Sequence, residues 1–138
     1  MRIVIDTNQL VILLARCEGQ LRLKSYLTGD GITHITSAFI MGEVERVLRR
    51  KFGHTKRQAL VAMRLLKRHS IVVRPQTIET IARDPYDDYI LAAALIGGAD
   101  YIVTADNDLL VLGQYRGICI VGAERIDEML KGQEEGRA

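Results

Sequence analysis

Short apolar runs alternate with longer amphipathic segments along this chain. Five runs are rich in β-branched residues and short enough to be strands, at 3–5, 32–35, 71–73, 101–103 and 118–121. Between them, apolar residues recur at helical spacing over 8–16, 19–27, 37–52, 55–69, 86–96 and 124–130. Strands that alternate with helices predict an α/β fold, here a three-layer α/β/α arrangement with a mostly parallel central sheet of about five strands.

Residues that begin or end helices support these boundaries. Ser37 can cap the helix that follows it, and Gly53 can end that helix. Asp84 and Pro85 supply a cap and a first-turn proline, and Gly97 can close the helix that they begin. No linker, repeat or low-complexity segment interrupts the pattern. We therefore expect one domain over residues 1–131 and a flexible, polar C-terminal tail over 132–138.

Composition narrows the class of protein. The 138 residues are 48% hydrophobic and 26% charged, as in soluble globular domains, and no apolar stretch is long enough to span a bilayer. The first residues contain no secretion signal, so we expect a cytoplasmic protein that does not enter a membrane. Cys17 and Cys119 fit no metal-binding spacing, and both are expected to be reduced and largely buried.

Positive charge is concentrated in one part of the chain. The net charge is only +2, yet ten of the 19 Lys and Arg residues lie between positions 46 and 74, where there is no Asp or Glu. Such a block attracts polyanions, although on helices it can equally be an ordinary solvated face. The candidate binding residues in this block are Arg46, Arg49, Arg50, Arg64 and Arg68.

Two aspartates follow predicted strands. Asp6 comes directly after 3–5 and Asp106 shortly after 101–103, so both are expected at the carboxyl edge of the sheet. That edge is where ligands bind in open α/β folds. Each aspartate can instead be a helix cap, and Asp108 is a further candidate cap. Two acids brought to one edge by separate strands favour a shared site over unrelated caps.

Glu43 is an acid on a helix face that should be buried. It shares this face with Ile40 and Val47, three residues before it and four after it. The alternative is an ion pair with Arg46 one turn away, which stabilises a helix by only some tenths of a kcal/mol. Burying a charge costs far more than such a pair returns, so we favour a role for Glu43 in a site.

Asp87 and Asp88 open the helix predicted over 86–96. Asp87 lies along the apolar stripe of this helix, whereas Asp88 is rotated away from its centre. For Asp84 and Asp87, a favourable interaction with the helix dipole is an alternative explanation. Asp87 is therefore the preferred site residue, and Asp88 is kept in reserve.

Four converging carboxylates repel one another and raise one another's pKa values unless a cation is present. Carboxylates suit Mg²⁺ or Mn²⁺ better than zinc, and the three histidines of the chain show no ligand spacing. Such ions lower the pKa of a bound water and stabilise charge on a phosphate. The acids therefore point to hydrolysis of a phosphate compound.

Four segments, spread in order over roughly residues 2–123, resemble the PIN domain. They read IVIDTN at 3–8, SAFIMGE at 37–43, DPYDD at 84–88 and GADYIVTAD at 98–106. The resemblance implies a three-layer α/β/α ribonuclease whose acids bind Mg²⁺ or Mn²⁺ and activate water to cut RNA. Many small stand-alone members are toxins of prokaryotic toxin–antitoxin pairs and are often dimers, which implies an antitoxin partner and a homodimer.

The same resemblance assigns roles to individual residues. Asp6, Glu43, Asp87 and Asp106 match the acidic quartet of the family, and metal ligands are expected among Asp6, Asp87, Asp106 and Asp108. Asn8 and Thr104 match polar residues that brace the first and last of these acids. The cations between positions 46 and 74 would then hold the RNA backbone, which an acidic pocket alone would repel.

Two other functions fit some of the same residues. A phosphatase or phosphotransferase can use an aspartate after an apolar first strand as its nucleophile, but it usually needs a second Asp where this chain has Asn8. A non-catalytic module would use the acids as caps and the basic face to bind RNA or a protein.

Overall fold

The computed structural model, which describes residues 1–15 and 17–136, is built on a six-stranded sheet with the order β3-β2-β1-β4-β6-β5. The strands are β1 (Arg2–Ile5), β2 (Thr33–Ser37), β3 (Ser70–Val73), β4 (Tyr101–Val103), β5 (Gln114–Tyr115) and β6 (Ile118–Val121). All neighbouring strands pair in parallel except β5, which runs antiparallel to β6. The sheet is therefore mostly parallel, as the sequence predicts.

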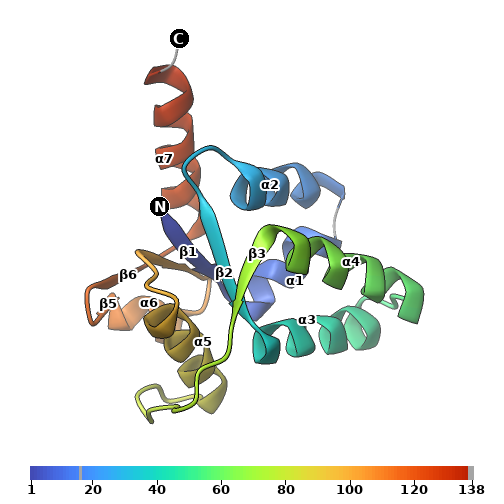
Figure 1. The fold of residues 1–138 in the computed structure, drawn as a ribbon, viewed down its shortest axis with the longest axis horizontal. Coiled ribbons are helices and arrows are strands. Elements are labelled where there is room, and N and C mark those ends of the chain that lie inside the picture. The colour runs from blue at the N-terminus through green and yellow to red at the C-terminus, as the bar shows by residue number, and fades with distance from the viewer. Residues whose placement is uncertain (16, 137–138) are drawn as a thin grey trace.

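Helices cover both faces of this sheet. They are α1 (Thr7–Ala15), α2 (Cys17–Thr28), α3 (Ala38–Lys51), α4 (Lys56–His69), α5 (Pro85–Ile96), α6 (Asn107–Leu112) and α7 (Ala123–Gly136). Helices α1 to α4 pack on one another on one side of the sheet, whereas α5 and α6 lie on the other (Figure 1). The expected three-layer α/β/α fold is confirmed.

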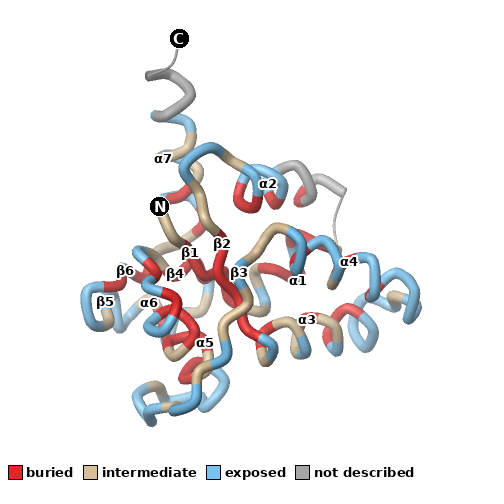
Figure 2. The backbone as a smooth tube through the Cα atoms, in the orientation of Figure 1, coloured by how far each residue is buried: buried red, intermediate tan, exposed pale blue. Residues whose placement is uncertain are grey.

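The core is deepest around the central strands. Ile3, Val4 and Ile5 of β1 are completely buried, because helices cover both faces of this strand (Figure 2). The outer strand β3 is only half covered, and its Ile71 is exposed. Continuous burial brings β1 and its neighbours β2 and β4 into fixed register, so their carboxyl ends lie together.

The predicted caps fix where the helices begin. The Ser37 hydroxyl accepts a hydrogen bond from the Ile40 N–H (3.1 Å), and α3 therefore begins directly at the end of β2. The Asp84 carboxylate accepts from the Tyr86 N–H (3.0 Å) at the start of α5. At the other end of α5, a Cβ on Gly97 would lie 2.6 Å from a methyl group of Ile35, so α5 packs tightly on β2 only because this residue is glycine.

The structure adds detail to two expectations from the sequence and corrects a third. The two-residue strand β5, which the pattern did not indicate, adds a sixth strand to a sheet expected to have about five. Helix α7 runs to Gly136 and so includes the first residues of the expected tail. Cys119 is wrongly predicted to be buried: it lies on the solvent side of β6. The prediction for Cys17 concerns a side chain that lies outside the described ones. Within the described part of the chain, no helix is long and apolar enough to cross a membrane.

Candidate active site

Asp6 and Asp106 meet at the carboxyl edge of the sheet through Thr104. Asp6 is 6% exposed, and its carboxylate accepts hydrogen bonds from the Thr104 hydroxyl and from the Gln9 N–H (2.9 Å). The Thr104 oxygen in turn accepts from the Asp106 N–H (2.9 Å). Burial raises the pKa of Asp6, and these two hydrogen bonds offset it only in part. Thr104 thus holds the two acids in one arrangement.

Asp106 and Asp108 also act as helix-start residues. The Asp106 carboxylate caps α6 by accepting from the Asp108 N–H (2.9 Å), so the alternative interpretation of Asp106 as a cap is realised as well. A cap uses one carboxylate oxygen and leaves the other available. Asp108 is exposed in the first turn of α6 and does not line the pocket that contains Asp106.

Glu43 lies one turn into α3, above the end of β2. It forms the ion pair with Arg46 that the sequence offered as an alternative, at 2.6 Å, and its side chain is 19% exposed. Both residues line the same pocket as Asp6. The ion pair itself therefore lies within the pocket wall, and pairing with Arg46 does not take Glu43 away from the other acids.

Asp87 has the most unusual environment of the candidate acids. It is 7% exposed, and its Oδ2 atom is buried without a hydrogen-bond partner in the described structure. Burial is the largest cause of a raised pKa at Asp87, and the charges of Asp106, Asp84 and Asp6 add to it in that order, so that together they bring the pKa to about 7. A buried carboxylate oxygen without a donor is a position that a cation would satisfy.

Asp88, the reserve candidate, makes a different set of contacts. Its Oδ1 accepts hydrogen bonds from the N–H groups of Ile81 (3.0 Å) and Ala82 (2.6 Å). It is as deeply buried as Asp87 but lines a separate pocket on the other side of α5. Asp88 therefore fastens the loop before α5 rather than facing the acids.

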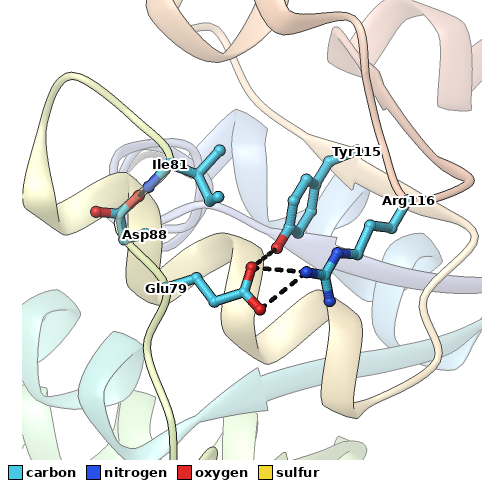
Figure 3. A network of polar contacts seen from close by, with 5 residues as sticks. All are labelled: Glu79, Ile81, Asp88, Tyr115 and Arg116. Carbon is cyan, nitrogen blue, oxygen red and sulfur yellow. Dashed lines mark hydrogen bonds and ion pairs between the residues drawn. The ribbon is translucent and has the colours of Figure 1, made fainter.

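A second attachment fixes the same loop. The Glu79 carboxylate accepts from the Tyr115 hydroxyl (3.0 Å) and forms an ion pair with Arg116 (2.8 Å), as Figure 3 shows. Tyr115 belongs to β5, the strand that was missed in the sequence. The loop over 74–84 is thus tied to the opposite edge of the sheet and to α5, and these ties set the position at which Asp87 enters the site.

The acids converge on a pocket of about 270 Å³. The candidates that line it are Asp6, Asn8, Glu43, Asp87 and Asp106. Six further lining residues were not assigned to the acidic site in the sequence, namely Thr7, Val47, Lys51, Asp84, Tyr86 and Ile90. Asp84 was interpreted only as a cap, and neither Lys51 nor Tyr86 belongs to a periodic pattern that would reveal its direction.

Two of the candidate arginines line this pocket and three do not. Arg46 and Arg50 face it, and Arg49 shares an adjoining surface pocket with both. Arg64 and Arg68 are exposed on α4 and line neither pocket. The cations of α3 therefore lie beside the acids, which gives the site positive charge at its rim and negative charge within.

The acids of this pocket do not form a complete metal site, but they are sufficient for an ion that keeps most of its waters. Within residues 1–15 and 17–136, no three His, Cys, Asp or Glu side chains are grouped closely enough to form a complete metal site. Mg²⁺, however, keeps several waters and is usually held by one or two carboxylates. The unpartnered oxygen of Asp87 and the nearby carboxylates of Asp6 and Asp106 meet that smaller requirement.

The fold and this pocket together define an α/β/α protein with a carboxylate-lined site at the carboxyl edge of its sheet. A model of the PIN domain matches residues 2–108, and the chain belongs to this family. A search of curated proteins gave no significant match.

Two solved structures share the fold. Mycobacterium tuberculosis VapC20, described as a sarcin-ricin loop cleaving toxin, is 18% identical over 85% of this chain and 98% of its own, with a TM-score of 0.58. Rickettsia felis VapBC2, determined bound to a DNA fragment from its promoter, is 12% identical over 87% of this chain and 97% of the matched chain, with a TM-score of 0.60.

Proposed function

We propose that this chain is an endoribonuclease that hydrolyses phosphodiester bonds of RNA with Mg²⁺ or Mn²⁺, and that it is the toxin of a toxin–antitoxin pair. The observation that carries the proposal is the Asp87 carboxylate, which has a buried oxygen without a partner and whose pKa is raised to about 7 by burial first and by the neighbouring acids second. Membership of the PIN domain family and the two toxin-type structural neighbours support the ribonuclease class.

Each acid has a distinct part in this proposal. Asp6, Asp87 and Asp106 would hold the ion, which would supply an activated water and neutralise charge on the phosphate. Asp108, exposed in the first turn of α6 two residues after Asp106, assists through water. Thr104 keeps Asp6 oriented through its hydrogen bond, and Asn8 presents a polar side chain to the same pocket. Glu43 adds a fourth carboxylate and orients Arg46 toward the substrate backbone.

The first test compares three activities of the purified chain. We expect cleavage of single-stranded RNA in the presence of Mn²⁺, and we expect EDTA or Asp6→Asn to reduce the rate by more than about 100-fold, the upper end of what loss of a supporting metal contact costs. The control is the same substitution at Asp30, which lies in the turn between α2 and β2, where the strands begin rather than end. The Asp30→Asn variant should cleave RNA at the wild-type rate.

The same experiment separates the rival functions. Hydrolysis of small phosphate esters without RNA cleavage would instead support the phosphatase, in which Asp6 is the nucleophile. Binding of RNA without either reaction would support the non-catalytic module. Cleavage that persists in EDTA would contradict the metal-dependent mechanism.

A second test concerns the basic surface and divides the candidate arginines by position. Arg49→Ala with Arg50→Ala removes two cations beside the pocket, and Arg64→Ala with Arg68→Ala removes two from α4. If both pairs contact phosphates, each double variant should reduce the slope of log affinity against log salt by about 1.4 for single-stranded RNA. The measurement is fluorescence anisotropy in an Asp6→Asn background. An unchanged slope for a pair would remove that pair from the RNA-binding surface.

The proposal also includes a protein partner. Leu23 and Leu27 of α2 and Val61 and Leu65 of α4 line an apolar groove of about 1170 Å³, and Val61 is largely exposed. We propose that an antitoxin covers this groove. We also propose that the protein acts in the cytoplasm and that it forms a homodimer. A short upstream reading frame for a DNA-binding protein would support the antitoxin, and light scattering would check the dimer.

A further inference from the structure

Three aromatic side chains form a cluster that includes Tyr86, a residue that lines the acidic pocket. The chain has only two Phe and five Tyr and no Trp, yet Phe39, Tyr86 and Tyr89 lie together where the N-termini of α3 and α5 meet. The rings of Phe39 and Tyr89 are stacked, with centroids 3.8 Å apart and an interplanar angle of 12°. The ring of Tyr86 is tilted by 39° against Phe39 at 5.8 Å. This aromatic cluster is held by packing on both helices.

Tyr86 is the exposed member of the cluster. It is 53% exposed and lines the acidic pocket, and Asp87 follows it directly in the chain. Leaving a large aromatic ring half exposed forgoes part of the free energy that its burial would provide. The Tyr86 ring contacts the ring of Phe39, which in turn stacks on Tyr89. Tyr86 is therefore held in place by side chains of two helices rather than carried on a loop.

The surroundings of Tyr86 offer both contacts that a nucleotide strand needs. Arg46 and Arg50 line the same pocket and supply positive charge for a backbone phosphate. An aromatic ring beside such cations offers a flat surface for the adjacent base, and stacking accepts any base because each has a π-face. Bases are free to stack in this way in single-stranded segments and loops but not in a regular duplex.

We infer that Tyr86, supported by Phe39, is a stacking platform for an unpaired base next to the phosphate that enters the acidic pocket. This inference rests on the proposed ribonuclease function and deepens it, because it makes unpaired RNA the preferred substrate. Tyr86 binds and orients the strand, and the acids carry out the reaction.

The absence of tryptophan makes a direct test available. Tyr86→Trp in an Asp6→Asn background places a single indole at the platform, and its fluorescence is followed while a single-stranded ten-nucleotide RNA is added. We expect saturable quenching by the single strand and much less by the matching duplex. The control is Tyr101→Trp in the same background, at the first residue of β4 and therefore at the opposite edge of the sheet, which should not be quenched.

Steady-state kinetics with the active enzyme provide the second readout. Tyr86→Leu should raise KM for single-stranded RNA about tenfold, within the range for loss of one stacked base, with kcat changed less than about twofold. Tyr86→Phe keeps the ring and should behave like the wild type. Equal rates for the leucine variant and the wild type would overturn the platform, and so would a phenylalanine variant as impaired as leucine.

The two proposals fail in different ways. Lack of RNA cleavage by the wild-type chain overturns the ribonuclease function, and the fluorescence titration does not depend on it. Quenching that is absent at position 86, or equal at positions 86 and 101, overturns the platform even if the wild type cleaves RNA.

Discussion

Replacing Asp87 by asparagine is expected to reduce metal-dependent RNA cleavage by more than about 100-fold, whereas Asp88→Asn should leave it within about threefold in the folded protein. The two residues are neighbours in the chain and equally buried, so the substitutions are matched in size, charge and depth. Only Asp87 lines the acidic pocket and has an unpartnered oxygen. Asparagine keeps the shape of the side chain but removes the negative charge that would hold the ion.

Effects of the same two variants on stability should run in the opposite order. Asp88 accepts two backbone N–H groups from the loop before α5, and weakening these charge-assisted bonds should lower the free energy of unfolding by about 2 kcal/mol. Asp87→Asn removes repulsion among acids and should not destabilise the protein at neutral pH. Denaturant melts and single-turnover cleavage, measured on both variants, would check this. A fully active Asp87→Asn variant, or an Asp88→Asn variant that is folded but inactive, would contradict the assignment.

Much of the fold could be predicted because helix starts and buried strands leave local signals in the sequence. Helices α3 and α5 begin at caps that are visible in the sequence, since Ser37 and Asp84 each accept a hydrogen bond from an N–H in the first turn. Strand β1 is a continuous apolar run because both of its faces are covered. Strand β5 was missed because two residues, Gln114 and Tyr115, carry no periodic signal, and their pairing with β6 is a tertiary contact.

The exposure of side chains on strands near the edge of the sheet could not be predicted from the hydrophobic pattern either. The run 118–121 is apolar throughout and is typical of a strand covered on both faces. In the structure Ile118 and Ile120 are buried, but Cys119 faces solvent, because this strand lies near the edge of the sheet. Which strand lies at an edge depends on strand order, and no single segment of sequence contains that information.

In the candidate site, too, some residues could be placed from the sequence, whereas others depend on contacts between distant segments. Strand ends place Asp6 and Asp106 at one edge, and this follows from topology alone. The choice between Asp87 and Asp88 does not, because both lie in the first turn of α5 and differ only in what surrounds them. The loop N–H groups that occupy Asp88 come from Ile81 and Ala82, in a segment with no regular structure.

Stability of the wild-type protein is expected to fall as pH rises from about 4 to about 7. The pKa of Asp87 is about 7 in the folded state, against an ordinary value of 3.8. Between these values the folded state keeps a proton that the unfolded state has lost, so the free energy of unfolding decreases with pH. The contribution is complete below about pH 4 and is lost as pH rises through about 7. The raised pKa of Asp6 acts in the same direction.

Asp87→Asn should therefore be more stable than the wild type at about pH 8, by roughly 1–2 kcal/mol after allowing for solvent screening, and similar to it near pH 4. Chemical denaturation of both proteins across this range gives the comparison. If the two stability curves stay parallel from about pH 4 to about pH 8, Asp87 does not carry the raised pKa that the geometry implies.

Divalent ions should reverse this loss of stability in the wild type. Mn²⁺ binds ionised carboxylates and competes with protons, so at about pH 8 a concentration of about 100 times Kd should raise Tm by roughly 5 °C or more. At about pH 5 the protons on the raised-pKa acids should reduce the shift, and Asp87→Asn should show little at either pH. KCl at equal ionic strength, together with Asp30→Asn, separates site binding from general charge screening. A shift that is the same at both pH values, or that survives in Asp87→Asn, would mean that the ion stabilises the protein somewhere other than among these acids.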